Sequence, residues 1–143
     1  MAQRCVTVLV SSAGRRVALL EAFREDAAQL GLSVRMLAAD MAPELSAACH
    51  VADAAFAVPG ARDPGFIPEM RKIAEREGVD LIVPTIDTEL PALAAARDAF
   101  AAAGTRVAVS APDVVAVARD STALILSCPP RASPRPRRAC PTR

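Results

Sequence analysis

The chain has 143 residues, a length typical of a single domain. Apolar residues make up 52% of the sequence but aromatic residues only 3%, so the core must be aliphatic, which argues against an RNA-binding surface of stacking rings. The net charge is +1, but five of the 17 basic residues lie within residues 129–143, leaving 12 basic against 16 acidic groups elsewhere. This acidic body argues against nucleic-acid binding.

The sequence predicts a cytosolic protein without a membrane partner. The apolar run in residues 1–10 is too short for a signal peptide, and no stretch approaches the ~20 apolar residues of a membrane span. The four cysteines have no CxxC spacing, which predicts free thiols. Cys49 is next to His50, but adjacent side chains diverge and no further ligands follow at suitable spacing, so we expect no metal site.

Short apolar runs alternate with helical periodicity along the chain. Strands are expected at residues 5–10, 33–39, 54–58, 79–83 and 106–109. Helices are expected from residue 16 to 30, from 63 to 77, from 90 to 103 and from 114 to 118, with a one-turn or irregular segment at 43–48.

Three patterns refine these expected helices. Glycines at the helix ends indicate stops at Gly31, Gly78 and Gly104. Ser110 and Asp113 resemble a capping box before the last helix. Apolar residues spaced by three or four indicate the first helix, at Val17, Leu20, Phe23, Ala27 and Leu30. In the second helix, apolar residues lie on one face, at Phe66, Met70, Ile73 and Ala74.

This alternation predicts an α/β fold: a Rossmann-like, open, mainly parallel sheet of about five strands with helices on both faces. Residues 1–120 would form this domain. Residues 121–143 are rich in Pro and Arg and have little to bury, so we expect a disordered tail.

Three segments fall at the carboxyl ends of expected strands, where ligands bind in open α/β sheets. The first contains Ser11, Ser12, Gly14, Arg15 and Arg16, in which the glycine permits close backbone approach and the helix start offers free N–H groups. It matches no phosphate-loop motif, so a plain strand–helix turn remains an alternative.

The other two segments carry acids. Asp40 ends the second expected strand, where dinucleotide folds place a ribose-binding carboxylate; a solvated carboxylate is the alternative. Thr85, Asp87, Thr88 and Glu89 are more polar groups at one strand end than helix capping requires, which favours substrate contact; acids that cap and stabilise a helix start are the alternative. With one histidine and no nucleophile elbow, the sequence indicates a binding half-site rather than a complete catalytic centre.

The segments VLVSSAGRRVALLEAF, LAAD, FAVPGARDPGFI, VDLIVPTIDTELPALA and VAVSAPDVVAVARD, in this order, resemble the N-terminal, pre-ATP-grasp domain of ATP-grasp ligases. The closest type is similar to carbamoyl-phosphate-synthase large-subunit-like proteins, and the resemblance covers residues 5–120. It implies a Rossmann-like sheet that packs against an ATP-grasp module and helps to shape the substrate site.

The resemblance also implies a chemistry. Later domains of the family hold ATP and Mg²⁺ and activate a carboxylate as an acyl phosphate for attack by an amine. SSAGRR, Thr85, Asp87 and Glu89 are the ligand-facing positions by this resemblance. We expect neither ATP nor Mg²⁺ to bind this chain tightly, and we expect a small-molecule substrate as its partner through the missing ATP-grasp module. An apolar surface left bare there would invite self-association.

The chain departs from the family after Asp120. A nucleotide-contacting Lys typically follows, whereas this chain has Ser121 and no ATP-grasp module, so we expect it to be inactive alone. Residues 132–136 can be encoded by codons that, in the reading frame one base earlier, encode Gly-Ile-Pro-Thr-Pro. The family typically has this phrase at about this place. We therefore expect a frameshift between Asp120 and Cys128; a genuine basic tail that binds an acidic partner is the alternative.

Other function classes fit less well. A stand-alone small-ligand-binding or regulatory module remains the second interpretation. A receiver domain needs clustered acids after the first strand and a late Lys, but the only Lys is Lys72, within an expected helix. A small NAD-dependent enzyme would need the glycine fingerprint, which is absent.

Overall fold

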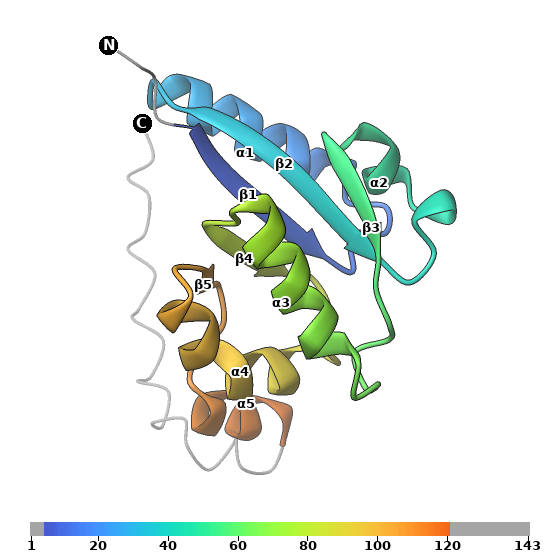
Figure 1. Cartoon of the computed structure of the whole chain (residues 1–143), viewed down its shortest axis with the longest axis vertical. Coiled ribbons are helices and arrows are strands. Elements are labelled where there is room, and N and C mark those ends of the chain that lie inside the picture. Colours follow the sequence, from blue (N-terminus) through green and yellow to red (C-terminus); the bar gives the residue numbers. More distant parts are fainter. Residues whose placement is uncertain (1–4, 121–143) are drawn as a thin grey trace, which may run out of the picture.

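The computed structural model describes residues 5–120, which form one parallel sheet with helices on both faces (Figure 1). The strands are β1 (Cys5–Ser11), β2 (Ser33–Asp40), β3 (Ala54–Ala57), β4 (Leu81–Pro84) and β5 (Arg106–Val107). The helices are α1 (Val17–Gln29), η1 (Pro43–Leu45, a 3-10 turn), α2 (Ala47–Val51), α3 (Phe66–Glu77), α4 (Leu90–Ala102) and α5 (Pro112–Arg119). The α/β prediction is confirmed.

The strand order is β3-β2-β1-β4-β5, and every neighbouring pair is parallel. Val10 of β1 lies between Ala38 of β2 and Val83 of β4. Strands β2 and β3 follow one another on one side of β1, and β4 then pairs with the other side of β1. The order therefore reverses between β1 and β4, at the point where open α/β sheets bind ligands.

Successive residues of β1 enter opposite cores because side chains alternate along a strand. Val8 and Val10 face α1 and α2, where they pack with Leu20. Leu9 faces α3 and α4, where it packs with Phe66. Because helices cover both faces of β1, neither face is exposed to solvent, and this explains the continuous apolar run in the strand.

Helix α3 has the buried face that its spacing predicts, since Phe66, Met70, Ile73 and Ala74 are all 2% exposed or less. It ends at Gly78, whose φ of +62° is a left-handed conformation that favours glycine. It begins at Phe66 rather than near residue 63. The Asp63 carboxylate accepts a 2.7 Å hydrogen bond from the N–H of Gly65 and so makes a turn before the helix.

Leu30, the last residue of the helical spacing in the first helix, is the C-cap of α1, with 74% of its surface exposed. Two details of the sequence prediction are wrong. Ser110 does not cap α5: the N-cap is Ala111 and no side chain caps the helix, because Pro112 already occupies the first turn. Strand β5 has only two residues, because the N–H of Val109 turns back to the carbonyl of Val107 at 2.9 Å.

The predicted disordered tail and frameshift at residues 121–143 lie outside the residues that the structure describes. Between residues 5 and 120, no helix combines the length and apolar character needed to cross a membrane. Of the cysteines in this range, Cys5 is free and exposed although it opens β1, and Cys49 is free and buried.

Candidate functional site

The loops after β1, β2, β3 and β4 surround a cavity of about 260 Å³ at the carboxyl edge of the sheet. It lies across the point where the strand order reverses. The β1–α1 loop contributes Ser12, and the β4–α4 loop contributes Ile86 and Thr88. The remaining lining comes from Met41 and from residues 58–62, which follow β3.

Glu89 joins two of these loops from inside the protein. Its side chain has no exposed surface. One carboxylate oxygen accepts hydrogen bonds from the hydroxyls of Ser11 at 2.6 Å and Ser12 at 2.9 Å. The other accepts from the backbone N–H groups of Thr85 at 2.6 Å and Ile86 at 3.1 Å. Four donors offset the cost of burying this charge, so Glu89 holds the site together rather than facing a ligand.

Two further contacts join the same loops. The hydroxyl of Thr85 lies 2.9 Å from the carbonyl oxygen of Ser11 and 2.7 Å from that of Ser12. From the exposed side, the guanidinium of Arg16 donates to the carbonyl of Thr85 at 2.8 Å. Because the two loops lie more than 70 residues apart in sequence, these bonds fix the mouth of the cavity.

Asp40 connects the first loop to β2. Its carboxylate accepts from the N–H of Gly14 at 2.8 Å and from the N–H of Ala42 at 3.3 Å. The hydroxyl of Ser46 donates to the carbonyl of Gly14 at 2.8 Å and accepts from the N–H of Cys49 at 3.3 Å, as the cap of α2. The predicted cofactor ligand is therefore engaged with the backbone on both of its oxygens.

The first loop needs two left-handed residues in quick succession. Gly14 has a φ of +49°, which glycine adopts readily. Ser12 has a φ of +50°, and among the described residues it is the only one other than glycine with a positive φ. A serine there costs about 1–2 kcal/mol relative to a relaxed backbone. The bond to Glu89 helps to keep it in place.

The structure separates the predicted site residues into two groups. Ser11, Gly14, Asp40, Thr85 and Glu89 are engaged in the loop framework. Four others are more accessible. Thr88 lines the 260 Å³ cavity, and so does Ser12, whose hydroxyl also donates to Glu89. Arg15 is exposed, and Arg16 is exposed but bonded to Thr85. Asp87 is exposed on the other side of its loop, where it lines a different cavity of about 510 Å³ with Leu90 and α5.

The third loop of the cavity, which includes Gly60 and Arg62, was not predicted from the sequence. A β-carbon on Gly60 would lie 3.3 Å from the sulfur of Met41, so the absence of a side chain keeps this wall open. The signal was present in the Pro59-Gly60 turn, because it follows a strand of the same parallel sheet and must therefore emerge at the same edge.

Burial raises the pKa of the Cys49 thiol, the nearby Asp40 charge adds to this effect, and the hydrogen bond with Ser46 opposes it, so the thiol stays protonated. Within residues 5–120, no three His, Cys, Asp or Glu side chains are grouped so that they could hold a metal ion.

Comparison with known proteins identifies the family. Residues 8–108 match the family model described as "PylC-like, N-terminal domain". A search of curated proteins finds no match.

Several solved carboxylase structures share the fold. The chain is 29% identical to a single-chain, multi-domain long-chain acyl-CoA carboxylase, with a TM-score of 0.54, and the match covers 83% of this chain and 12% of that one. It is 20% identical to the biotin carboxylase domain of a single-chain bacterial carboxylase, with a TM-score of 0.58, covering 83% and 27%. A multifunctional pyruvate carboxylase from Rhizobium etli is 22% identical, with a TM-score of 0.55, covering 86% and 12%.

The chain thus spans only about an eighth to a quarter of the length of these structures. The family match covers more than two thirds of the chain, and it confirms the resemblance to the N-terminal domain of ATP-grasp ligases. The chain therefore belongs to the family of PylC-like N-terminal domains.

Proposed function

We propose that this domain supplies part of the substrate site of an ATP-dependent carboxylate–amine ligase. In this function it acts together with an ATP-grasp module and is inactive as residues 1–143 alone. The observation that carries the proposal is the 260 Å³ cavity at the strand-order reversal, whose loops are fixed by Glu89.

The narrower assignment to a carbamoyl-phosphate-synthase-like ligase rests on SSAGRR and PTIDTEL and belongs to the same proposal. So does a cytosolic location, which suits the free thiols of Cys5 and Cys49.

The cavity suits a small substrate that carries a carboxylate. Arg62 lies at its rim and is exposed, and no carboxylate of the described residues forms an ion pair with it. Its guanidinium would bind a carboxylate in a bidentate manner. The hydroxyls of Ser12 and Thr88 and the side chains of Met41 and Ile86 would contact the rest of the substrate.

ATP and Mg²⁺ belong to the ATP-grasp module in this proposal. Among residues 5–120, no three His, Cys, Asp or Glu side chains are grouped so that they could hold the Mg²⁺ ion. The module would form the acyl phosphate from ATP, and this domain would bind and orient the substrate beside it.

The test is a ligand titration of the isotope-labelled chain followed by NMR. Amino acids and dicarboxylates should shift the amide signals of Ser12, residues 60–62, Ile86 and Thr88. The substitution Arg62→Gln should abolish the shifts. Arg71→Gln, an exposed arginine of α3 that pairs with Glu75 at 3.5 Å, should leave them unchanged.

Two results would contradict the proposal. Shifts confined to residues outside the cavity would show that the ligand binds elsewhere. A saturable thermal stabilisation by Mg·ATP, worth about 2.7 kcal/mol at a hundredfold excess over the dissociation constant, would show that the domain binds the nucleotide by itself.

A further inference from the structure

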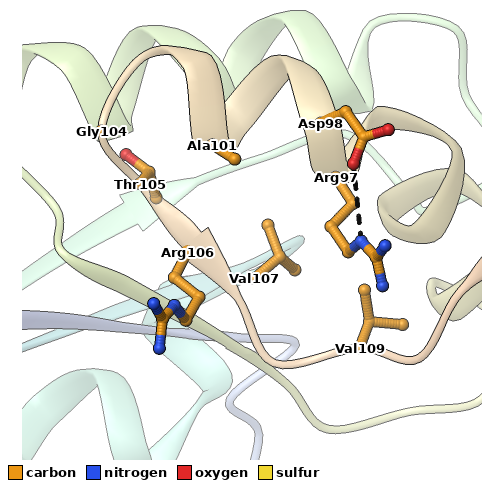
Figure 2. Close-up of a pocket in the computed structure, with 8 residues that line it drawn as sticks. All are labelled: Arg97, Asp98, Ala101, Gly104, Thr105, Arg106, Val107 and Val109. Carbon is orange, nitrogen blue, oxygen red and sulfur yellow. Dashed lines mark ion pairs between the residues drawn. The ribbon is translucent and has the colours of Figure 1, made fainter.

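The open edge of the sheet at β5 borders a cavity that lies apart from the substrate cavity. It has a volume of about 430 Å³ and lies between β5 and α4 (Figure 2). Val107 forms part of its wall, with Arg106 on one side and Arg97 and Asp98 on the other. Neither the substrate proposal nor the loop framework uses any of these residues.

The backbone of β5 leaves one donor directed outward. The N–H of Arg106 donates to the carbonyl of Asp80 at 2.8 Å, and the N–H of Ala108 donates to that of Ile82 at 2.9 Å. Alternate residues of a parallel strand face the same neighbour, so the intervening N–H of Val107 points to the open edge. Within residues 5–120, β5 is the last strand of the sheet and no strand pairs with its outer side, and an edge strand of this kind is a site for pairing with another chain.

The side chains beside this edge carry opposite charges that are weakly engaged. The side chain of Asp98 is 97% exposed, and its contact with the Nε of Arg97 is long, at 3.7 Å. Surface pairs of this kind contribute little. Arg106 is exposed, and no carboxylate in the described part of the chain forms an ion pair with it.

We propose that this edge binds a second copy of the chain, related by a twofold axis that passes near Val107. The axis would bring Asp98 of each copy to Arg106 of the other, because the acid and the base lie on opposite sides of Val107 (Figure 2). The contact would be isologous, so each charge pair would occur twice. The two outward N–H groups of Val107 would face each other's strand.

The observations favour a second copy over an extended peptide or another domain. Strand β5 has two residues and directs one N–H outward, which is too little backbone to align a peptide. Asp98, with Arg97 beside it, lies on one side of Val107 and Arg106 lies on the other, and a twofold axis would bring each acid to the base of the second copy. Apolar area adjoins them, since Val109 also lines the 510 Å³ cavity, together with Val114, which is 51% exposed.

The test measures the oligomeric state of the 143-residue chain by sedimentation at concentrations up to about 100 μM, which resolves micromolar dissociation constants. The wild type should dimerise. Asp98→Arg and Arg106→Asp should each raise the dimer dissociation constant by at least about tenfold, since each places like charges together twice. An equimolar mixture of the two variants should form a heterodimer, in which both pairs are again of opposite charge.

The mixture separates the proposal from simple misfolding, because a damaged chain would not be rescued by another damaged chain. The proposal is overturned if the wild type remains monomeric at these concentrations. It is also overturned if either single reversal leaves the dimer intact, or if the mixture fails to restore it. If the wild type and both variants were all monomeric, the edge at β5 would not be a contact between two copies of this chain.

Discussion

The side chains of Ser11 and Glu89, separated by 78 residues in sequence, are joined by a buried 2.6 Å hydrogen bond at the point where the strand order reverses. Ser11 ends β1, and Glu89 immediately precedes α4. The bond thus connects the two strands whose carboxyl ends frame the candidate substrate cavity, and it makes a carboxylate part of the framework.

Glu89→Ala should destabilise the domain by about 3 kcal/mol or more, because it leaves several buried donors without acceptors. Glu89→Gln should cost only about 1 kcal/mol, since its amide oxygen can still accept from the backbone while the serine hydroxyls rotate to accept from its NH₂. Urea unfolding measures both. Asp87→Ala, at an exposed position in the same loop, is the control and should change stability by less than about 0.5 kcal/mol. Equal midpoints for Glu89→Ala and the wild type would contradict this role.

The left-handed backbone of Ser12 predicts an unusual order of stabilities. Ser12→Ala loses the hydrogen bond to Glu89 and keeps the strained φ of +50°. Ser12→Gly loses the same bond but relaxes the backbone, so it should be more stable than Ser12→Ala by about 1 kcal/mol. Thermal unfolding of the two variants checks this, and an alanine variant at least as stable as the glycine variant would refute it.

Glu77 predicts a pH dependence of stability. Its carboxylate accepts from Arg35 at 2.8 Å and from Arg76 at 2.9 Å, and these hydrogen bonds, that of Arg35 first, lower the pKa of Glu77. A lowered pKa in the folded state means that the stabilisation is present above the unfolded pKa of about 4.3 and is lost as the pH falls through the folded value.

Glu77→Gln should therefore reduce stability near neutral pH and show a shallower loss as the pH falls below about 4.3. The free energy of unfolding of both proteins, measured from neutral to acidic pH, checks this. Glu75→Gln is the control, because Glu75 is 59% exposed and contacts Arg71 only at 3.5 Å. If the two glutamine variants had the same pH profile, the pairing of Glu77 would have no effect on stability.

The two cysteines of the described region should differ in reactivity. Cys5 is exposed, whereas burial raises the pKa of Cys49 and reduces the thiolate that reacts. Iodoacetamide should modify Cys5 first in the native protein and both at similar rates in urea, as followed by peptide mass spectrometry. Faster native modification of Cys49 would mean that α2 opens readily.

The fold could be predicted from sequence because its signals are local. The spacing of Phe66, Met70, Ile73 and Ala74 defines a helix face without reference to the rest of the chain, and the apolar runs define the strands. The role of Glu89 could not be predicted in this way. An acid before a helix is common at the surface, and the hydroxyls that bury it come from a loop more than 70 residues earlier.

The candidate site was predictable in part for the same reason. Ser12 and Thr88 were expected at strand ends and do line the cavity. Arg62 was not expected, because its loop follows a weak strand and carries no motif. Asp87 faces a different cavity, and only the three-dimensional path of its loop determines that.

The late pairing of β4 with β1 also bears on how the protein is made. During synthesis, β1, β2 and β3 leave the ribosome first and can pair in sequence, but Leu9 and Leu37 then face solvent until α3 arrives. The register of Val8 with Leu81 closes a loop of more than 70 residues, and this closure adds Ile82 to the second core. The half-made domain therefore exposes an apolar sheet face until α3 and α4 cover it, and such a face is prone to aggregation.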